Sequence, residues 1–88
     1  MRRDNMEIWM QRMRDLERVA ETFPGVGKAY AMRSGKELRV IVETEKVSDA
    51  DVIWLSKDIA ARIEREVNYS GQVRVNVIRE VRAVDYAK

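Results

Sequence analysis

The stretch Gly71-Gln72-Val73-Arg74-Val75-Asn76-Val77-Ile78-Arg79 decides the fold. Val73, Val75 and Val77 point to one side of an extended chain, while the residues between them point to the other side. This period of two is typical of a strand that is buried on one face. Three valines in register need an apolar surface over them, so we expect helices from elsewhere in the chain to cover this face of a sheet.

Two other stretches have the three-to-four-residue spacing of amphipathic helices. The first is predicted over residues 5–22, with Asp4 and Glu7 as a capping box. Its spacing also fits a short heptad seam, but we favour packing on the sheet over a coiled coil because the seam has fewer than three heptads. The second is predicted from the N-cap Ser48 to about Val67, and residues 68–71 are expected to end it. The apolar stripes are Met6, Trp9, Met13, Leu16, Ala20 and Phe23 in the first helix, and Val52, Leu55, Ile59, Ala60, Ile63 and Val67 in the second.

A β-hairpin is predicted between these helices. Residues 23–25, Phe-Pro-Gly, end the first helix, and Ser34-Gly35 forms a turn between strands at 26–33 and 37–43. In the first strand, Gly27, Ala29 and Ala31 are expected to point inward, because burying Lys28 on the opposite face would place an unpaired charge in the core. In the returning strand, the inward-facing residues are Leu38, Val40 and Val42.

These elements predict an α+β fold with the order α-β-β-α-β. A right-handed crossover makes the third strand parallel to the second. We expect the third strand to lie beside the first, which gives a mixed three-stranded sheet of order 2-1-3 with both helices on one face, like half of a ferredoxin-like fold. The chain is expected to be a single domain over residues 1–88, made of an N-terminal helix (1–23) and a ββαβ module (24–88).

Composition excludes several kinds of chemistry. The 88 residues contain no cysteine and no histidine. Disulfides, zinc sites of the Cys and His kind, and imidazole-dependent catalysis therefore need side chains that the chain lacks. The carboxylates are scattered, so we expect no catalytic residue, no metal site and no cofactor. The net charge of +2 is mildly basic, which permits contact with RNA without implying it. No apolar run is long enough to span a bilayer, and a reducing cytoplasm is the expected compartment.

The sheet face without helices is the candidate contact surface, and we call it the open face. Its long amphipathic side chains suit docking or dimerisation, which we favour, or a stacking platform for single-stranded RNA. A plain solvated face has the same appearance. Trp54 lies opposite the apolar stripe of the second helix, where it is either an interface residue or a partly covered neighbour of a loop. The predicted open-face residues are Lys28, Tyr30, Met32, Arg39, Ile41, Arg74, Asn76 and Ile78.

Residues 26–42, 57–60 and 71–88 resemble the C-terminal region of ribonuclease Y, a family of bacterial endoribonucleases, and the tail is the most specific part. Ser70 and Thr44 stand at loop positions where that family is expected to have proline. The resemblance implies the last part of a larger protein that has a membrane anchor, a coiled coil, a KH domain and an HD-type phosphohydrolase domain. No position here matches the metal-binding His and Asp motif of the HD domain.

What the resemblance implies for this chain is an accessory role in RNA turnover. Its expected partners are the remainder of the parent chain, in particular the HD domain, and a second copy in a homodimer. Contact with RNA is expected to be weak, and contact of this segment with the membrane is not expected. The element order is also similar to that of the cytoplasmic domain of cation diffusion facilitator transporters, but those domains bind metal largely through histidine, which is missing here.

Overall fold

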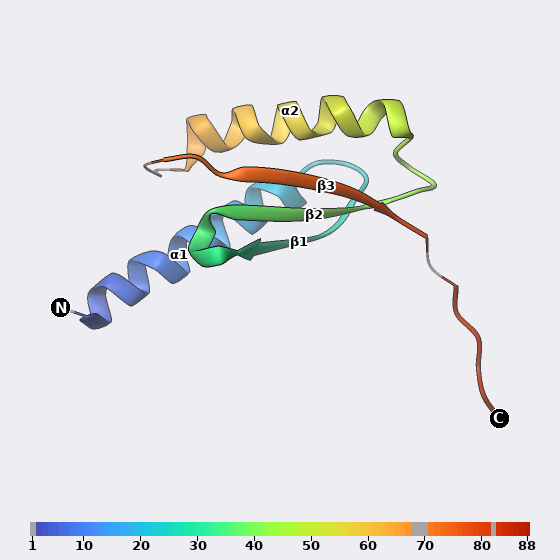
Figure 1. Cartoon of the computed structure of the whole chain (residues 1–88), viewed down its shortest axis with the longest axis horizontal. Helices are drawn as coiled ribbons and strands as arrows, with labels where there is room; N and C mark the ends of the chain where they lie inside the picture. The colour runs from blue at the N-terminus through green and yellow to red at the C-terminus, as the bar shows by residue number, and fades with distance from the viewer. Residues whose placement is uncertain (1, 68–70, 82) are drawn as a thin grey trace.

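The computed structural model describes residues 2–67, 71–81 and 83–88, and it describes side chains from residue 7 onward. The elements are α1 (Arg2–Glu21), β1 (Val26–Met32), a short 3-10 helix η1 (Arg33–Gly35), β2 (Glu37–Glu43), α2 (Asp49–Glu66) and β3 (Arg74–Glu80). The predicted α+β class and the order α-β-β-α-β are confirmed (Figure 1). The first helix begins at Arg2, ahead of the predicted start. The predicted helix-breaking segment at 68–71 falls mainly on residues 68–70, which lie outside the described residues.

The residue types at the ends of two helices explain where α2 begins and why the chain turns after α1. The Ser48 side chain accepts a hydrogen bond from the Asp51 N–H at 3.2 Å, so the predicted N-cap of α2 is confirmed. Gly25, in the turn after α1, has a φ of +88°, a conformation that glycine adopts without strain. A Cβ at this position would also collide with the side chain of Val47. Only glycine fits this turn.

The strand order differs from the prediction. β1 pairs with β2 in antiparallel fashion, and β3 pairs with β2 in parallel fashion, so β2 is the central strand and the order is β1-β2-β3. The mixed sheet is confirmed, but the predicted order 2-1-3 is wrong. In a ferredoxin-like fold, the two parallel strands of each half are separated by another strand. Here the parallel strands β2 and β3 are adjacent, so the predicted likeness to half of a ferredoxin-like fold is also wrong.

Two glutamates of α1 explain why β3 does not lie beside β1. The Ala31 N–H donates to Glu17 Oε2 at 2.8 Å, and the Ala29 N–H donates to Glu21 Oε2 at 3.4 Å. These N–H groups point away from β2, so they belong to the outer edge of β1. Because α1 already provides acceptors for these N–H groups, the edge has few donors left for hydrogen bonds to another strand. β3 therefore pairs with the other edge of β2.

Replacement of Glu17 tests this arrangement. We expect Glu17→Ala to lower the free energy of unfolding by about 1 kcal/mol, because the Ala31 N–H loses its acceptor at a partly covered edge. Glu17→Gln keeps an acceptor oxygen and is expected to recover about half of that loss. Urea denaturation followed by circular dichroism measures both. Equal losses in the two variants would contradict the hydrogen-bond explanation.

The core lies between the sheet and the two helices. Leu38 and Val40 of β2 are fully buried, as are Leu16 of α1 and Ile59 of α2. Val73, Val75 and Val77 pack against this cluster as partly buried residues, whereas Arg74 is exposed. The predicted orientation of the last strand is therefore confirmed, and both helices cover the same face of the sheet.

Helix α1 packs on the sheet only through its C-terminal half. Leu16, Val19 and Ala20 are buried there. Toward the N-terminus, Ile8 and Met10 are about half exposed, and the helix extends past the sheet (Figure 1). The predicted apolar stripe is thus divided between core packing near Ala20 and solvent exposure near Trp9, which is 42% exposed.

Candidate functional site: the open face of the sheet

The strand register brings the predicted open-face residues together in three rows. Tyr30 of β1 lies opposite Arg39 of β2, and Arg39 lies opposite Asn76 of β3. The neighbouring rows are Lys28 with Ile41 and Ile78, and Met32 with Glu37 and Arg74. Cross-strand neighbours on one face have Cβ atoms about 5 Å apart. All eight predicted residues therefore share one surface.

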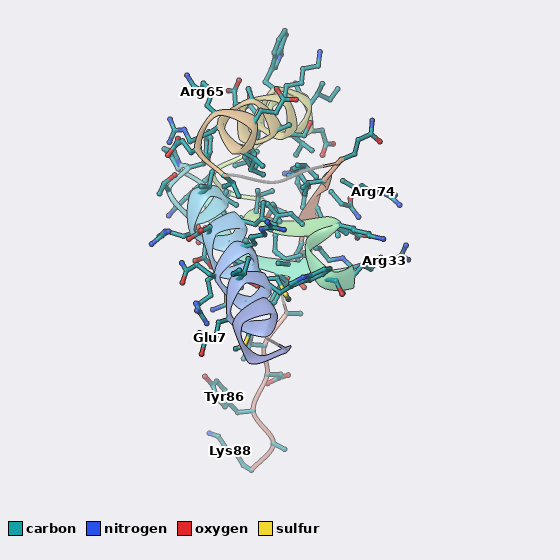
Figure 2. The ribbon with its side chains drawn as sticks, turned by 90° about the vertical axis from the view of Figure 1, so that its left-hand side faces the viewer. Glu7, Arg33, Arg65, Arg74, Tyr86 and Lys88 are labelled. Atoms are coloured by element: carbon teal, nitrogen blue, oxygen red, sulfur yellow. The ribbon has the colours of Figure 1, made fainter. Side chains whose placement is uncertain are left out.

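A shallow hollow occupies the β1 and β2 part of this face. It is lined by Lys28, Tyr30, Met32, Arg39 and Ile41, together with Ala31 and Glu80. The Tyr30 side chain is 48% exposed, so its ring is available for stacking or apolar contact. Figure 2 shows Arg74 and Arg33 on the side of the molecule away from α1, which agrees with their place on the uncovered side of the sheet.

Acidic residues that the sequence reasoning did not assign to this face change its electrostatics. Glu37 is 5% exposed and lies between two arginines, with its carboxylate 3.5 Å from Arg39 Nη2 and 3.7 Å from Arg33 Nε. Strand alternation also places Glu43 and Glu80 on the open face. The carboxylates of Glu37, Glu43 and Glu80 thus lie among the strand cations Lys28, Arg39 and Arg74, and two further cations, Arg33 and Lys46, pair with Glu37 and Glu43. The only signal for these carboxylates in the sequence was their parity in the strands.

Arg39 is held within the face. Its guanidinium pairs with Glu37, and its Nε is buried without a hydrogen-bond partner within the described part of the chain. A buried N–H donor that lacks an acceptor carries a desolvation cost. The part of the Arg39 side chain that remains accessible, 42% of its surface, is the part that a partner could contact.

Trp54 does not belong to the open face. It lies on the outer side of α2 and is 64% exposed, with Lys57 Nζ 5.0 Å from the centroid of its ring. Ile53 beside it is 58% exposed. The structure thus keeps Trp54 apart from the eight sheet residues, on the helical side of the molecule.

Arg79 has a structural position that the sequence reasoning missed. Its Nε donates to the Val47 carbonyl at 2.8 Å and its Nη2 donates to the Thr44 carbonyl at 3.0 Å. Its Nη1 contacts the Asp49 carboxylate at 2.5 Å. Arg79 thereby fastens the loop between β2 and α2 to the end of β3. Its partners lie about 30 residues away in the sequence, so no local pattern could reveal them.

The chain after β3 is extended and carries exposed apolar side chains. Val81 is 85% exposed, Val84 is 75% exposed and Tyr86 is 81% exposed. Figure 2 shows Tyr86 and Lys88 on the segment that leaves the sheet. Over residues 2–67, 71–81 and 83–88, no helix has the length and apolar character needed to cross a membrane. The same residues contain no group of three or more His, Cys, Asp or Glu side chains placed to hold a metal ion.

Comparisons with known proteins identify relatives that carry the same protein name. No protein-family model matches the chain, and no solved structure matches it. Proteins named ribonuclease Y from Syntrophobacter fumaroxidans, Thermus thermophilus and Geobacter sulfurreducens are 56%, 54% and 49% identical to it over 87 residues. Each alignment covers 99% of this chain, but only 15–17% of the relative. The expected resemblance is confirmed, and the chain is homologous to a segment of ribonuclease Y.

Proposed function

We propose that this chain is a non-catalytic accessory domain of a ribonuclease Y-like endoribonuclease that acts in RNA turnover. In this proposal, it is the C-terminal piece of the parent protein and works by docking or self-association. The name of the relatives supports the link to RNA cleavage, and their much greater length leaves room for a separate catalytic domain. The absence of histidine from the sequence places imidazole-dependent chemistry outside this segment.

The observation that carries the docking role is the composition of the open face. Ile41, Ile78, Met32 and Tyr30 supply apolar area between charged groups of both signs, cations and carboxylates. Protein interfaces combine an apolar centre with charged groups that pair across the contact. A surface that binds single-stranded RNA instead needs an excess of positive charge along the backbone path. The carboxylates that lie among these cations therefore favour a protein partner, and we propose that the open face docks on the remainder of the parent chain.

Single-stranded RNA is the second candidate ligand of the same face. Tyr30 lies beside Arg39 in the central row, and an exposed ring next to a guanidinium is the usual arrangement for stacking a base. Glu37 already neutralises part of the Arg39 charge, which weakens this alternative. Contact with RNA, if it occurs on this face, is expected to be weak and to decrease with salt.

The two roles are separated by parallel measurements on two sets of variants. We expect Ile41→Asp or Ile78→Asp to weaken association with the remaining part of a ribonuclease Y chain by at least about tenfold, because a carboxylate would be buried in the apolar centre. Isothermal titration calorimetry measures this association, and thermal unfolding checks that the variants are folded.

Replacement of Tyr30, Arg39 and Arg74 by alanine tests the RNA role. Fluorescence anisotropy with a single-stranded oligonucleotide measures binding at several salt concentrations. If these replacements abolish a salt-dependent affinity while Ile41→Asp leaves protein association unchanged, the RNA-binding role replaces the docking role. Cleavage of RNA by the isolated chain with added divalent metal would contradict the non-catalytic assignment, and we expect none.

A further inference from the structure

We propose that two copies of this chain pair through the outer edge of β3 as antiparallel strands about a two-fold axis at Val77. This inference rests on the part of the proposed function that involves self-association. It specifies the surface through which two copies would associate and the register of their strands. The pairing would join two sheets of three strands into one sheet of six, and it would leave the open face of each copy uncovered.

The backbone geometry shows which groups are available at this edge. The Arg74 N–H donates to the Lys36 carbonyl at 2.8 Å, so the backbone groups of Arg74 point toward β2. Because successive residues of a strand alternate, the N–H and C=O groups of Val75, Val77 and Arg79 point away from the sheet. These backbone groups have no hydrogen-bond partner among the residues that the structure describes. An edge of this kind is a template for another strand.

The opposite edge of the sheet provides an internal contrast. Glu17 and Glu21 of α1 accept the outward N–H groups of Ala31 and Ala29 on β1. The fold thus closes the β1 edge with side chains, whereas none of the described residues covers the β3 edge. Strand pairing between copies is therefore expected at β3 and not at β1.

The sequence of β3 is self-complementary in one register. With the axis at Val77, Val75 of one copy stands opposite Arg79 of the second copy, and all outward N–H and C=O groups of the two strands meet partners. In the same register, Arg74 stands opposite Glu80 of the second copy, on the open face, and this pair occurs twice. A shift of the axis to Asn76 places Arg74 opposite Ile78, and a shift to Ile78 places Glu80 opposite Asn76. Only the register at Val77 pairs the charges.

The same register also brings together two apolar residues that flank β3, Val73 of one copy and Val81 of the other. Val81, directly after β3, is 85% exposed and lines a hollow with Lys28, Tyr30, Ile41 and Glu80 of its own copy. If the register continues past β3, Val81 would stand opposite Val73 of the second copy. Val73 is part of the wall of a hollow between α2 and β3, whose apolar lining is Ala60, Ile63, Val67, Val73 and Val75. The exposed Val81 of each copy would therefore meet Val73 of the other copy at the end of the paired strands. A second copy supplies both the missing hydrogen bonds and this apolar contact, which makes it the occupant that fits.

Val81→Asp is the first test, because Val81 is largely exposed and its replacement should leave the monomer stable. Sedimentation equilibrium of the 88-residue chain measures the dimer dissociation constant. We expect Val81→Asp to raise this constant by about tenfold or more, since both symmetric contacts lose apolar cover and gain a charge. Val84→Asp is the matched control, because Val84 is similarly exposed in the same tail but lies beyond the paired residues, and it should leave the constant nearly unchanged.

Charge reversal tests the register. Arg74→Glu alone and Glu80→Arg alone each place two like-charge pairs across the axis, so each variant is expected to dimerise about tenfold more weakly. An equimolar mixture of the two variants restores opposite charges in both pairs, and we expect the affinity to recover in a heterodimer. Lys28→Glu, on β1, is the charge control. Val77→Pro removes an outward N–H, which an edge strand tolerates, and should abolish pairing. Because the change also removes the Val77 side chain from the core, thermal unfolding checks that this variant is folded.

The outcomes distinguish this inference from the proposed function. A chain that remains monomeric at about millimolar concentration, or a mixture that shows no recovery, would overturn β3 pairing. A dimer that Ile41→Asp disrupts, while Val81→Asp and Val77→Pro do not, would overturn it in favour of association through the open face. In either case the proposed accessory role is tested separately, by measuring whether the chain binds the remainder of the parent protein.

Discussion

Leu38→Ala is expected to lower the free energy of unfolding by about 3 kcal/mol, which would be a large part of the stability of so small a domain. Leu38 lies on the central strand and has no exposed surface, in a cluster that includes Leu16, Val40 and Ile59. Removal of its branched end leaves a cavity that the two helices and the sheet cannot fill without moving together. Urea denaturation at 25 °C measures the loss, through the shift of the midpoint at constant slope.

Ile41→Ala is the matched control for this prediction, since Ile41 lies on the same strand but on the open face. Its expected loss is about 1 kcal/mol, because the side chain is only partly buried. Similar losses for the two variants would mean that the two faces of β2 are equally buried. That result would contradict the placement of both helices on one side of the sheet.

Arg79→Ala is the second variant with a large expected effect, about 2 to 3 kcal/mol of unfolding free energy. Arg79 donates to the Val47 and Thr44 carbonyls from a side chain that is 29% exposed. Its removal leaves two partly buried carbonyl oxygens without these charged donors, which costs more than the loss of a surface ion pair. Thermal unfolding monitored by circular dichroism, together with urea denaturation, measures the difference.

Asp49→Ala separates the two contributions of Arg79. The Asp49 side chain is 91% exposed, so its ion pair with Arg79 is expected to contribute no more than about 0.5 kcal/mol. Arg74→Ala, an exposed arginine on the same strand, should be nearly neutral in the monomer. If Asp49→Ala were as destabilising as Arg79→Ala, the ion pair and not the carbonyl contacts would hold the loop.

The parts of the fold that depend on local periodicity follow directly from the sequence. Val73, Val75 and Val77 alternate with polar residues, and their packing against the core agrees with that alternation. Ser48 begins α2 because its hydroxyl is the acceptor that the first turn needs. The eight open-face residues share a surface for the same reason, since parity within a strand determines the side of the sheet.

The strand order depended on interactions that no local pattern contains. Glu17 and Glu21 look like ordinary polar positions of an amphipathic helix, yet their carboxylates occupy the edge of β1. Arg79 likewise reads as one more charged residue of a strand, although its partners are the carbonyls of a distant loop. Both cases join a side chain to backbone groups far away in the sequence. The acidic part of the open face was missed for a related reason, because carboxylates spread along the chain gather only through strand register.

The closed edge of β1 also sets a limit on assembly. A sheet with two free edges could add copies from both ends and grow into a fibre. Here, Glu17 and Glu21 cover one end, so any addition at the other end must stop once a second molecule has joined. The glutamates of the first helix would thus protect a bacterial cell from open-ended polymers of this protein, a role distinct from their small contribution to the stability of one molecule.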